Sequence, residues 1–337
     1  MLEADVEKIK SDEKIWELFT KKEEYDAFFV DSHNRFNYQF SKYRDIFQPR
    51  VSEFLLQNDI KSEFFNNDRF SVFLSHDIDQ INLSLKYRVF SFLKYGSKKR
   101  FREGFERLLK NNIFLNFDEI MSLERKYDAK STFFIRAPKN PVSSVYVNQV
   151  YEAESIANEL HKILDNGFEI GLHTGYLSYD SIDDVKYEKK RLEEIINKKI
   201  VSCRNHCLRF KVPDTWEVLR KAGFMYDATF GYADCVGFRN GMCHPFRPFN
   251  LNTGREIDIV EIPLTIMDTT LFDYMHLDMK YAWKITKLLI DRVEKNNGII
   301  SILWHNTTLK EDTKFYEKIL RYCSNKGAEM DVDISKI

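Results

Sequence analysis

Several apolar stretches of this sequence end in side chains that bind metals or move protons. The first of them, Phe70 to Leu74, leads into Asp77 and Asp79. Taken singly, such a residue is more readily explained as a loop cap or a packed core side chain. A whole set at the same kind of position is not, so together they predict a catalytic site. The other members are His173, Arg204, His206 and His305.

The residue types in this set favour hydrolytic chemistry at a divalent metal. Aspartate and histidine ligands that leave one coordination position open suit a catalytic Zn²⁺ or another first-row metal. Such an ion lowers the pKa of a bound water and polarises a carbonyl group. Because two carboxylates follow one strand, one of Asp77 and Asp79 can bind the metal while the other accepts a proton.

These residues need a scaffold that brings strand ends together. From residue 70 onward, strand-like stretches alternate with amphipathic helical stretches, which predicts a parallel barrel or an open doubly wound sheet. In both, the carboxyl ends of the strands carry the site. The predicted strands are 70–79, 131–135, 168–173, 201–206, 259–264 and 298–305, and the predicted helices are 83–110, 117–126, 153–164, 186–196, 213–221 and 279–296.

The first 68 residues differ from the rest of the chain. They contain no glycine, and their apolar residues, such as Ile15, Leu18 and Phe19, are spaced as on one face of a helix. We therefore expect a helical N-terminal appendage over residues 1–68. It should pack on the domain formed by residues 69–337 and cover an edge or the rim of that domain.

Composition limits the class of protein. The formal net charge of −1 predicts no electrostatic footprint for nucleic acid or an anionic membrane. Five cysteines without a Cys-x-x-Cys pair favour a reducing compartment over a disulfide framework. The N-terminus lacks the pattern of a signal peptide, and no stretch reaches the roughly 20 apolar residues of a membrane span. We expect a cytoplasmic protein.

In their order along the chain, these motifs resemble those of the NodB-type polysaccharide deacetylases, carbohydrate esterase family four, and most of all the branch found in surface-polysaccharide loci. The resemblance implies a distorted (β/α) barrel with a metal at the carboxyl end of its strands. It also implies an enzyme that removes N- or O-acetyl groups from sugars. It spans residues from about 70 to 310 and is carried by Ser75-His76-Asp77-Ile78-Asp79, Ser131-Thr132-Phe133-Phe134, Gly167-Phe168-Glu169-Ile170-Gly171-Leu172-His173, Arg204 and Leu303-Trp304-His305.

The resemblance implies a metal site with one departure from the family. Asp79 and His173 match two metal ligands of the family, whereas the usual second histidine is replaced by Leu177, which cannot bind a metal. His206 is the best local replacement, and His76 is the alternative. The implied ion is Zn²⁺, with Co²⁺, Ni²⁺ and Mn²⁺ left open.

Catalytic roles follow from the same resemblance. Asp77 matches the general base, and His305 matches the histidine that protonates the leaving amine or hydroxyl. Arg204 matches the arginine that orients the base, and Arg209 is a second candidate for that ion pair.

Loop residues that follow strands are expected to contact the substrate. The implied substrate is an acetylated sugar, an oligosaccharide, or a glycan linked to a lipid or nucleotide. Two alternatives stay open: another metal-dependent amidohydrolase on the same barrel, and a non-catalytic carbohydrate-binding relative. The acid and base residues count against the second, because binding alone has no use for them. The expected substrate-binding residues are Arg209, Tyr176, Arg239 and Asp268.

Overall fold

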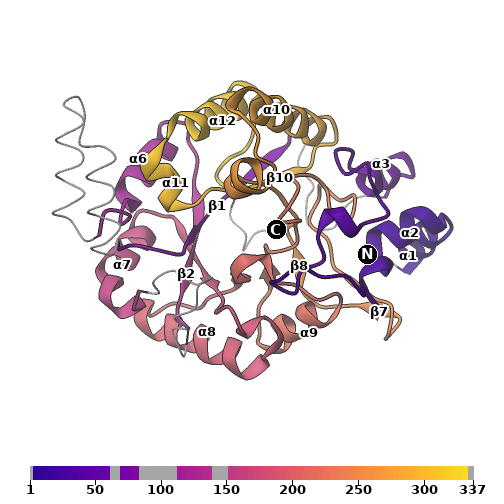
Figure 1. Ribbon diagram of the computed structural model, residues 1–337, viewed down its shortest axis with the longest axis horizontal. Helices are drawn as coiled ribbons and strands as arrows, with labels where there is room; N and C mark the ends of the chain where they lie inside the picture. The colour runs from indigo at the N-terminus through magenta and orange to yellow at the C-terminus, as the bar shows by residue number, and fades with distance from the viewer. Residues whose placement is uncertain (1–2, 61–68, 83–111, 139–150, 333–337) are drawn as a thin grey trace.

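A sheet of eight strands forms the scaffold of the computed structural model (Figure 1), which describes residues 3–60, 69–82, 112–138 and 151–332. The strands of this sheet are β1 (Ser71–Ile78), β2 (Ser131–Arg136), β3 (Glu169–His173), β4 (Ser202–Arg204), β5 (Tyr226–Asp227), β8 (Val260–Glu261), β9 (Leu264–Met267) and β10 (Ile299–Leu303). Their order across the sheet is β8-β5-β4-β3-β2-β1-β10-β9, and every neighbouring pair is parallel.

The sheet curls until its two edges come close together. β8 and β9 are the opposite edges, yet only Ile262 and Pro263 separate them along the chain. Since three peptide links span at most about 11 Å, the edges must approach one another. Proline has no amide hydrogen for a strand ladder, which explains why the single strand predicted over 259–264 is divided in two. The predicted distorted barrel is confirmed, and the open sheet is not found.

Alternate residues of a strand face the barrel interior and the surrounding helices. Phe73 and Phe134 belong to an apolar cluster inside the barrel, whereas Val72 and Phe133 belong to the larger cluster that includes helix residues. All residues of β1 are buried, as expected for a central strand of a parallel sheet. Because side chains alternate along a strand, Asp77 faces the same way as Phe73 and lies inside the barrel at its carboxyl end.

A ring of helices surrounds the strands (Figure 1). The predicted helix over 83–110 lies outside the described residues. None of the helices that the structure describes is long and apolar enough to cross a membrane. The short strands β6 (Phe249–Asn250) and β7 (Arg255–Glu256) form a separate antiparallel pair. The helices that follow the strands are α6 (Phe117–Arg125), α7 (Ala157–Asp165), α8 (Ile182–Ile196), α9 (Asp214–Lys221), α10 (Met279–Lys295), α11 (Asn306–Glu311) and α12 (Lys314–Asn325).

The N-terminal residues pack tightly on the barrel. Their helices are α1 (Glu3–Lys10), α2 (Glu13–Thr20) and α3 (Arg50–Gln57). Ile9, Leu18 and Val51 belong to the same apolar cluster as the barrel core. The backbone amides of Val51 and Ser52 both donate to the carbonyl of Gly241. The domain boundary predicted near residue 68 falls at 61–68, outside the described residues.

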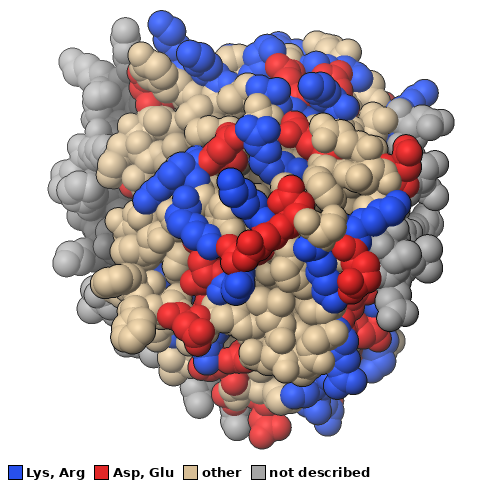
Figure 2. Space-filling model, turned by 90° about the vertical axis from the view of Figure 1, so that its right-hand side faces the viewer, with Lys and Arg blue, Asp and Glu red and all other residues tan. Residues whose placement is uncertain are grey.

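The stretch between α2 and α3 is mostly irregular, where the sequence suggested helix. Apart from the 3₁₀ turns η1 (Lys22–Glu24) and η2 (Tyr38–Phe40), it has no helical element. The Asp31 side chain accepts hydrogen bonds from the backbone amides of His33 and Arg35, and such local bonds compete with helix formation. Figure 2 shows the side of the molecule that carries the N-terminal helices, where basic and acidic side chains lie next to one another across the surface.

Candidate active site

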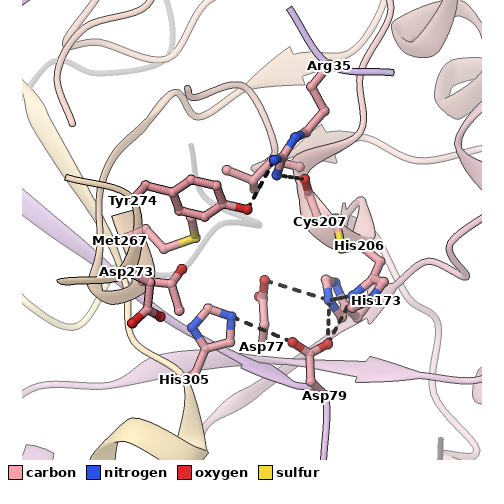
Figure 3. A pocket seen from close by; sticks show the side chains of 12 residues that line it. Arg35, Asp77, Asp79, His173, His206, Cys207, Met267, Asp273, Tyr274 and His305 are labelled. Carbon is pink, nitrogen blue, oxygen red and sulfur yellow. Dashed lines mark hydrogen bonds and ion pairs between the residues drawn. The ribbon is translucent and has the colours of Figure 1, made fainter. Parts of the chain in front are cut away.

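Three side chains that could hold a metal ion converge at the carboxyl end of the barrel (Figure 3). Asp79 follows β1, His173 ends β3 and His206 follows β4. Asp79 Oδ1 lies 3.2 Å from His173 Nε2 and 3.0 Å from His206 Nδ1. The two ring nitrogens are 3.1 Å apart. The sequence predicted these three residues as a set, and the structure brings them together.

The parallel register and a bend after β4 place the two histidines. His173 pairs with Arg204 across the β3 and β4 ladder, and its Nδ1 lies 3.0 Å from the Arg204 carbonyl. Because a carbonyl only accepts, Nδ1 carries the proton and Nε2 presents a lone pair. After His206, Cys207 and Leu208 both adopt positive φ angles of 57° and 53°. This left-handed bend turns the chain sharply just after His206. The His206 ring faces Asp79 from this position.

The spacing and electrostatics of this group fit a metal ion. Ligand atoms about 2.05 Å from a tetrahedral Zn²⁺ stand roughly 3.3 Å apart, and the three separations here are 3.0 to 3.2 Å. Asp79 Oδ1 is buried without a well-aligned hydrogen bond from the described residues. A bound cation would satisfy this buried oxygen. Burial alone would favour neutral Asp79, but the His206 and His173 rings hold its pKa well below the usual range.

Asp77 lies beside this group and faces a buried arginine. Arg204 Nη1 is 3.4 Å from Asp77 Oδ1, and Arg204 Nε donates to the Ala228 carbonyl at 2.9 Å. The guanidinium also stacks over the Phe134 ring at 4.7 Å. Burial lowers the pKa of Arg204, although Asp77 pulls it upward. The arrangement fixes one oxygen of Asp77, while the other lies 3.8 Å from His173 Nε2.

His305 approaches the same group from β10. Its Nδ1 donates to Asp268 Oδ1 at 2.6 Å, and its backbone amide donates to Asp268 Oδ2 at 3.0 Å. His305 Nε2 lies 3.7 Å from Asp79 Oδ2. Burial disfavours the charged ring, yet the Asp268 carboxylate raises the pKa of His305 to about 10. Asp268 was predicted to bind substrate. It is fully buried, so its role here is to hold the His305 ring.

A cavity of about 500 Å³ connects these residues. The lining residues that had not been predicted include Arg35 of the N-terminal segment, and Asp273 and Tyr274 of the π-helical turn η6 (Thr270–Tyr274). The run of polar residues from Asp31 to Arg35, set between Val30 and Phe36, was the one signal in the sequence that could have drawn attention to Arg35.

Three other predicted residues lie elsewhere or make other contacts. Arg239 is buried and paired with Glu24, and it does not line the cavity. His76, the alternative ligand, is turned away from the site, because its ring nitrogens contact the Trp304 carbonyl and Glu124. Arg209 does not pair with Asp77, since its guanidinium contacts the carbonyls of His33 and Tyr176.

Tyr176 is also a contact residue of the N-terminal segment. Its hydroxyl lies 3.0 Å from His33 Nδ1, and its ring lies under the Arg209 guanidinium at 4.3 Å. It is absent from the residues that line the cavity. Tyr176 and Arg209 were predicted to bind substrate, and the structure instead has both of them bound to residue His33.

Comparisons with known proteins agree with the fold. No family model and no curated protein matches the sequence. Among solved structures, a Mycobacterium smegmatis protein assigned to the polysaccharide deacetylases has a TM-score of 0.53 and 13% identity, over 79% of this chain and 88% of its own. The Puue allantoinase has a TM-score of 0.53 and 14% identity, over 91% of this chain and 96% of its own. The chain has the NodB-type polysaccharide deacetylase fold.

The similarity to the allantoinase structure extends beyond the barrel. Residues 69–337 make up a smaller share of the chain than the 91% that is covered. The shared fold therefore includes part of the N-terminal segment, which agrees with the tight packing of that segment on the barrel core.

Proposed function

We propose that this protein is a metal-dependent hydrolase that removes an N- or O-acetyl group from a carbohydrate, in the synthesis of a surface polysaccharide or another glycan. The observation that carries the proposal is the convergence of Asp79, His173 and His206 at the separations expected of metal ligands. In this proposal they hold one divalent ion, with Zn²⁺ as the first choice for an Asp and His ligand set.

The proposed reaction begins with removal of a proton from water. When bound, a divalent cation polarises the acetyl carbonyl and makes water more acidic. Asp77 takes the proton as the water oxygen bonds to the carbonyl carbon. Arg204, which lies 3.4 Å from Asp77 Oδ1, holds the carboxylate in place. The other Asp77 oxygen faces the cavity, where the water would lie.

Proton donation to the leaving group completes the reaction. As the bond from the carbonyl carbon to the sugar nitrogen or oxygen breaks, His305 Nε2 gives that atom a proton, and acetate is released. Asp268 fixes the ring through Nδ1, so that Nε2 remains the nitrogen that faces the cavity. The Asp268 carboxylate also stabilises the protonated ring before transfer, because opposite charges favour one another at close range.

A second candidate is hydrolysis of a small cyclic amide. The similarity to an allantoinase structure over 91% of the chain, and a cavity of about 500 Å³, favour it. A cavity of that volume suits small molecules. A purely binding role is disfavoured, because Asp77 and His305 each have a partner of opposite charge and face one cavity.

Elemental analysis joined to a substrate panel tests the proposal. Purified wild-type protein should contain close to one divalent ion per chain, and Asp79→Ala and His173→Ala should lose it. The control is His161→Ala, an exposed histidine of α7 whose ring lies 2.7 Å from the Ala157 carbonyl of its own helix. Acetate release from N-acetylhexosamines supports the first candidate, and hydrolysis of allantoin without acetate release supports the second. Unchanged metal content in both ligand variants would refute the site.

A further inference from the structure

A short stretch of the N-terminal segment forms one side of the cavity. We call residues 31–36 the N-terminal strap. The strap is tied to two loops after strands: His33 Nδ1 lies 3.0 Å from the Tyr176 hydroxyl, and Arg209 Nε donates to the His33 carbonyl at 2.8 Å. Of the strap residues, Arg35 lines the cavity that also contains Asp77, Asp79 and His305. The strap is therefore part of the site and not only part of the surface.

The strap is held in shape by one carboxylate. Asp31 Oδ1 accepts the amides of His33 and Arg35, and Asp31 Oδ2 accepts Arg35 Nε and the Asn37 side-chain amide. The Asp31 amide in turn donates to the Arg35 carbonyl at 3.0 Å. A segment whose polar groups are bonded to one another loses little further freedom when a ligand binds. The strap is thus pre-formed before any substrate arrives.

Arg35 crosses part of the mouth of the cavity (Figure 3). Its Nη1 donates to the Cys207 carbonyl at 2.8 Å, and its Nη2 donates to the Tyr274 hydroxyl at 3.0 Å. Cys207 follows β4 and Tyr274 follows β9, and in the barrel order β5 and β8 lie between these two strands. The guanidinium therefore closes the cavity on the side above β5 and β8. Its two partners are next to the proposed ligand His206 and in η6.

The Arg35 guanidinium, which lines the cavity, still has unused hydrogen-bonding capacity among the described residues. A guanidinium has five N–H donors, and Nη1 makes only one of the two hydrogen bonds open to it among the described residues. Its charge is balanced by Asp31, 2.8 Å away. A balanced guanidinium in a cavity suits a neutral oxygen, such as a sugar hydroxyl, better than it suits a second carboxylate or a phosphate.

We propose that the N-terminal strap limits the substrate to a single acetylated sugar unit, free or at the end of a glycan, and that Arg35 contacts a hydroxyl of that unit. The inference rests on the proposed deacetylase function. On the side above β5 and β8, an extended chain would have to pass the guanidinium where it joins Cys207 to Tyr274. A terminal unit needs only the cavity of about 500 Å³, which lies within the usual range for small-molecule sites.

The test compares single sugars with a polymer. The probes are N-acetylglucosamine, N-acetylgalactosamine, N-acetylmannosamine and the β-1,4-linked hexamer of the first. Wild-type, Arg35→Ala and Arg35→Lys proteins are loaded with zinc, and acetate release and the position of the deacetylated unit in the hexamer are measured. Arg44→Ala is the matched control, because Arg44 lies on the same segment but, among the described residues, donates to the nearby Tyr38 and Gln39 carbonyls.

We expect the wild type to deacetylate a terminal unit of the hexamer first. Loss of one hydrogen bond from a charged donor should raise KM for the preferred sugar roughly 10- to 100-fold in Arg35→Ala, with a smaller change in kcat because the contact is made in the ground state too. Arg35→Lys should be nearly as impaired, since a single ammonium cannot join Cys207 to Tyr274 and also reach the sugar. Arg44→Ala should behave as wild type.

Two results would overturn the inference while leaving the proposed function intact. One is deacetylation of internal units of the hexamer first, and the other is an unchanged KM in Arg35→Ala. If no sugar releases acetate, the proposed function fails. Calorimetric titration of metal-free protein with the three N-acetylhexosamines then tests whether Arg35 of the strap contributes to sugar binding. Weaker binding by Arg35→Ala than by wild type and Arg44→Ala would support it, and equal or absent binding would overturn it.

Discussion

The cavity has two sides of different origin. On one side, the carboxyl ends of the parallel strands β1, β3 and β10 hold Asp77, Asp79, His173 and His305. On the other, Arg35 is held by an irregular strap whose partners lie far away in the sequence. The first side carries the residues proposed for chemistry, and the second carries the residue proposed for substrate choice. This division matches a common arrangement in enzymes, where a rigid scaffold holds the reacting groups and loops vary the specificity.

The difference predicts separate consequences of mutation. Changes on the strand side should alter bond breaking, because in the proposed mechanism those groups touch the reacting atoms. Changes on the strap should alter substrate binding and leave the metal in place, since none of the strap residues is among the proposed ligands. Mutations on each side test whether chemistry and substrate binding are separable in this way.

The largest effect should come from Asp77→Asn. Asparagine keeps the shape of the side chain but cannot accept the proton from water, so hydrolysis should fall by roughly 10²–10⁴. Metal content should stay at the wild-type level, because the proposed ligands are untouched. Steady-state kinetics and elemental analysis of the same preparation measure both. If activity persists within about 3-fold, Asp77 is not the base.

His305→Ala should show an effect that depends on the leaving group. An amide nitrogen leaves poorly without a proton, whereas a phenolate needs no such help. The variant should therefore lose amide hydrolysis by roughly 10²–10⁴ and lose much less activity on an aryl acetate. Asp268→Asn should show the same pattern more weakly, since the ring remains but its orientation through Nδ1 is no longer fixed. Equal losses on both substrates would instead indicate that His305 positions the substrate.

Asp31→Ala should disturb only the strap side. Four hydrogen bonds converge on this carboxylate, so its loss should free Arg35 from its place and raise KM by about 10-fold. The proposed matched control is Asp45→Ala, because Asp45 lies in the same irregular stretch and its ion pair within the described part of the chain is with Arg50 at the surface. Metal content and kcat should remain close to wild type in both. A loss of metal in Asp31→Ala would show that the two sides are coupled.

The two sides also differ in how far the sequence could predict them. Strand ends follow from hydrophobic periodicity, and parallel strands bring their carboxyl ends together, so Asp79, His173 and His206 could be grouped without a structure. The Arg35 contacts to Cys207 and Tyr274 join positions with no periodic relation. Arg239 shows the same limit, because its buried partner Glu24 is more than 200 residues away. Nothing local in the sequence specifies such a pair.

Individual residue types could be recognised, but their direction could not. His76 and His173 both lie in strands, and both are candidate ligands by type. The side-chain alternation sends His76 outward to Glu124, whereas His173 faces Asp79. Asp268 was recognised as a loop residue. Its buried contact with the His305 ring, however, depends on how β9 and β10 pair. The direction in which each side chain points is therefore decided by tertiary packing more than by residue type.

The smallest effect concerns the attachment of the N-terminal segment. His244 Nδ1 lies 2.9 Å from the Ser52 hydroxyl of α3, and burial lowers the pKa of His244 from 6.5 to about 4. The groups described around it are neutral: the Ser52 hydroxyl, the Cys243 thiol and the backbone of Asn296 and Asn297. The buried ring therefore stays neutral in a pH range in which the unfolded chain takes up a proton.

The sign of the pH dependence follows. Since the folded pKa is depressed, the stability is full above about pH 6.5 and falls as the pH drops toward about 4. Between about pH 7.5 and about pH 5.5 this one group should remove about 1.4 kcal/mol from the free energy of unfolding. His244→Gln should be less sensitive to pH by that amount in urea denaturation, and His161→Gln, at an exposed position of α7, should match wild type. An identical pH dependence in His244→Gln and wild type would mean that His244 does not couple the N-terminal segment to barrel stability.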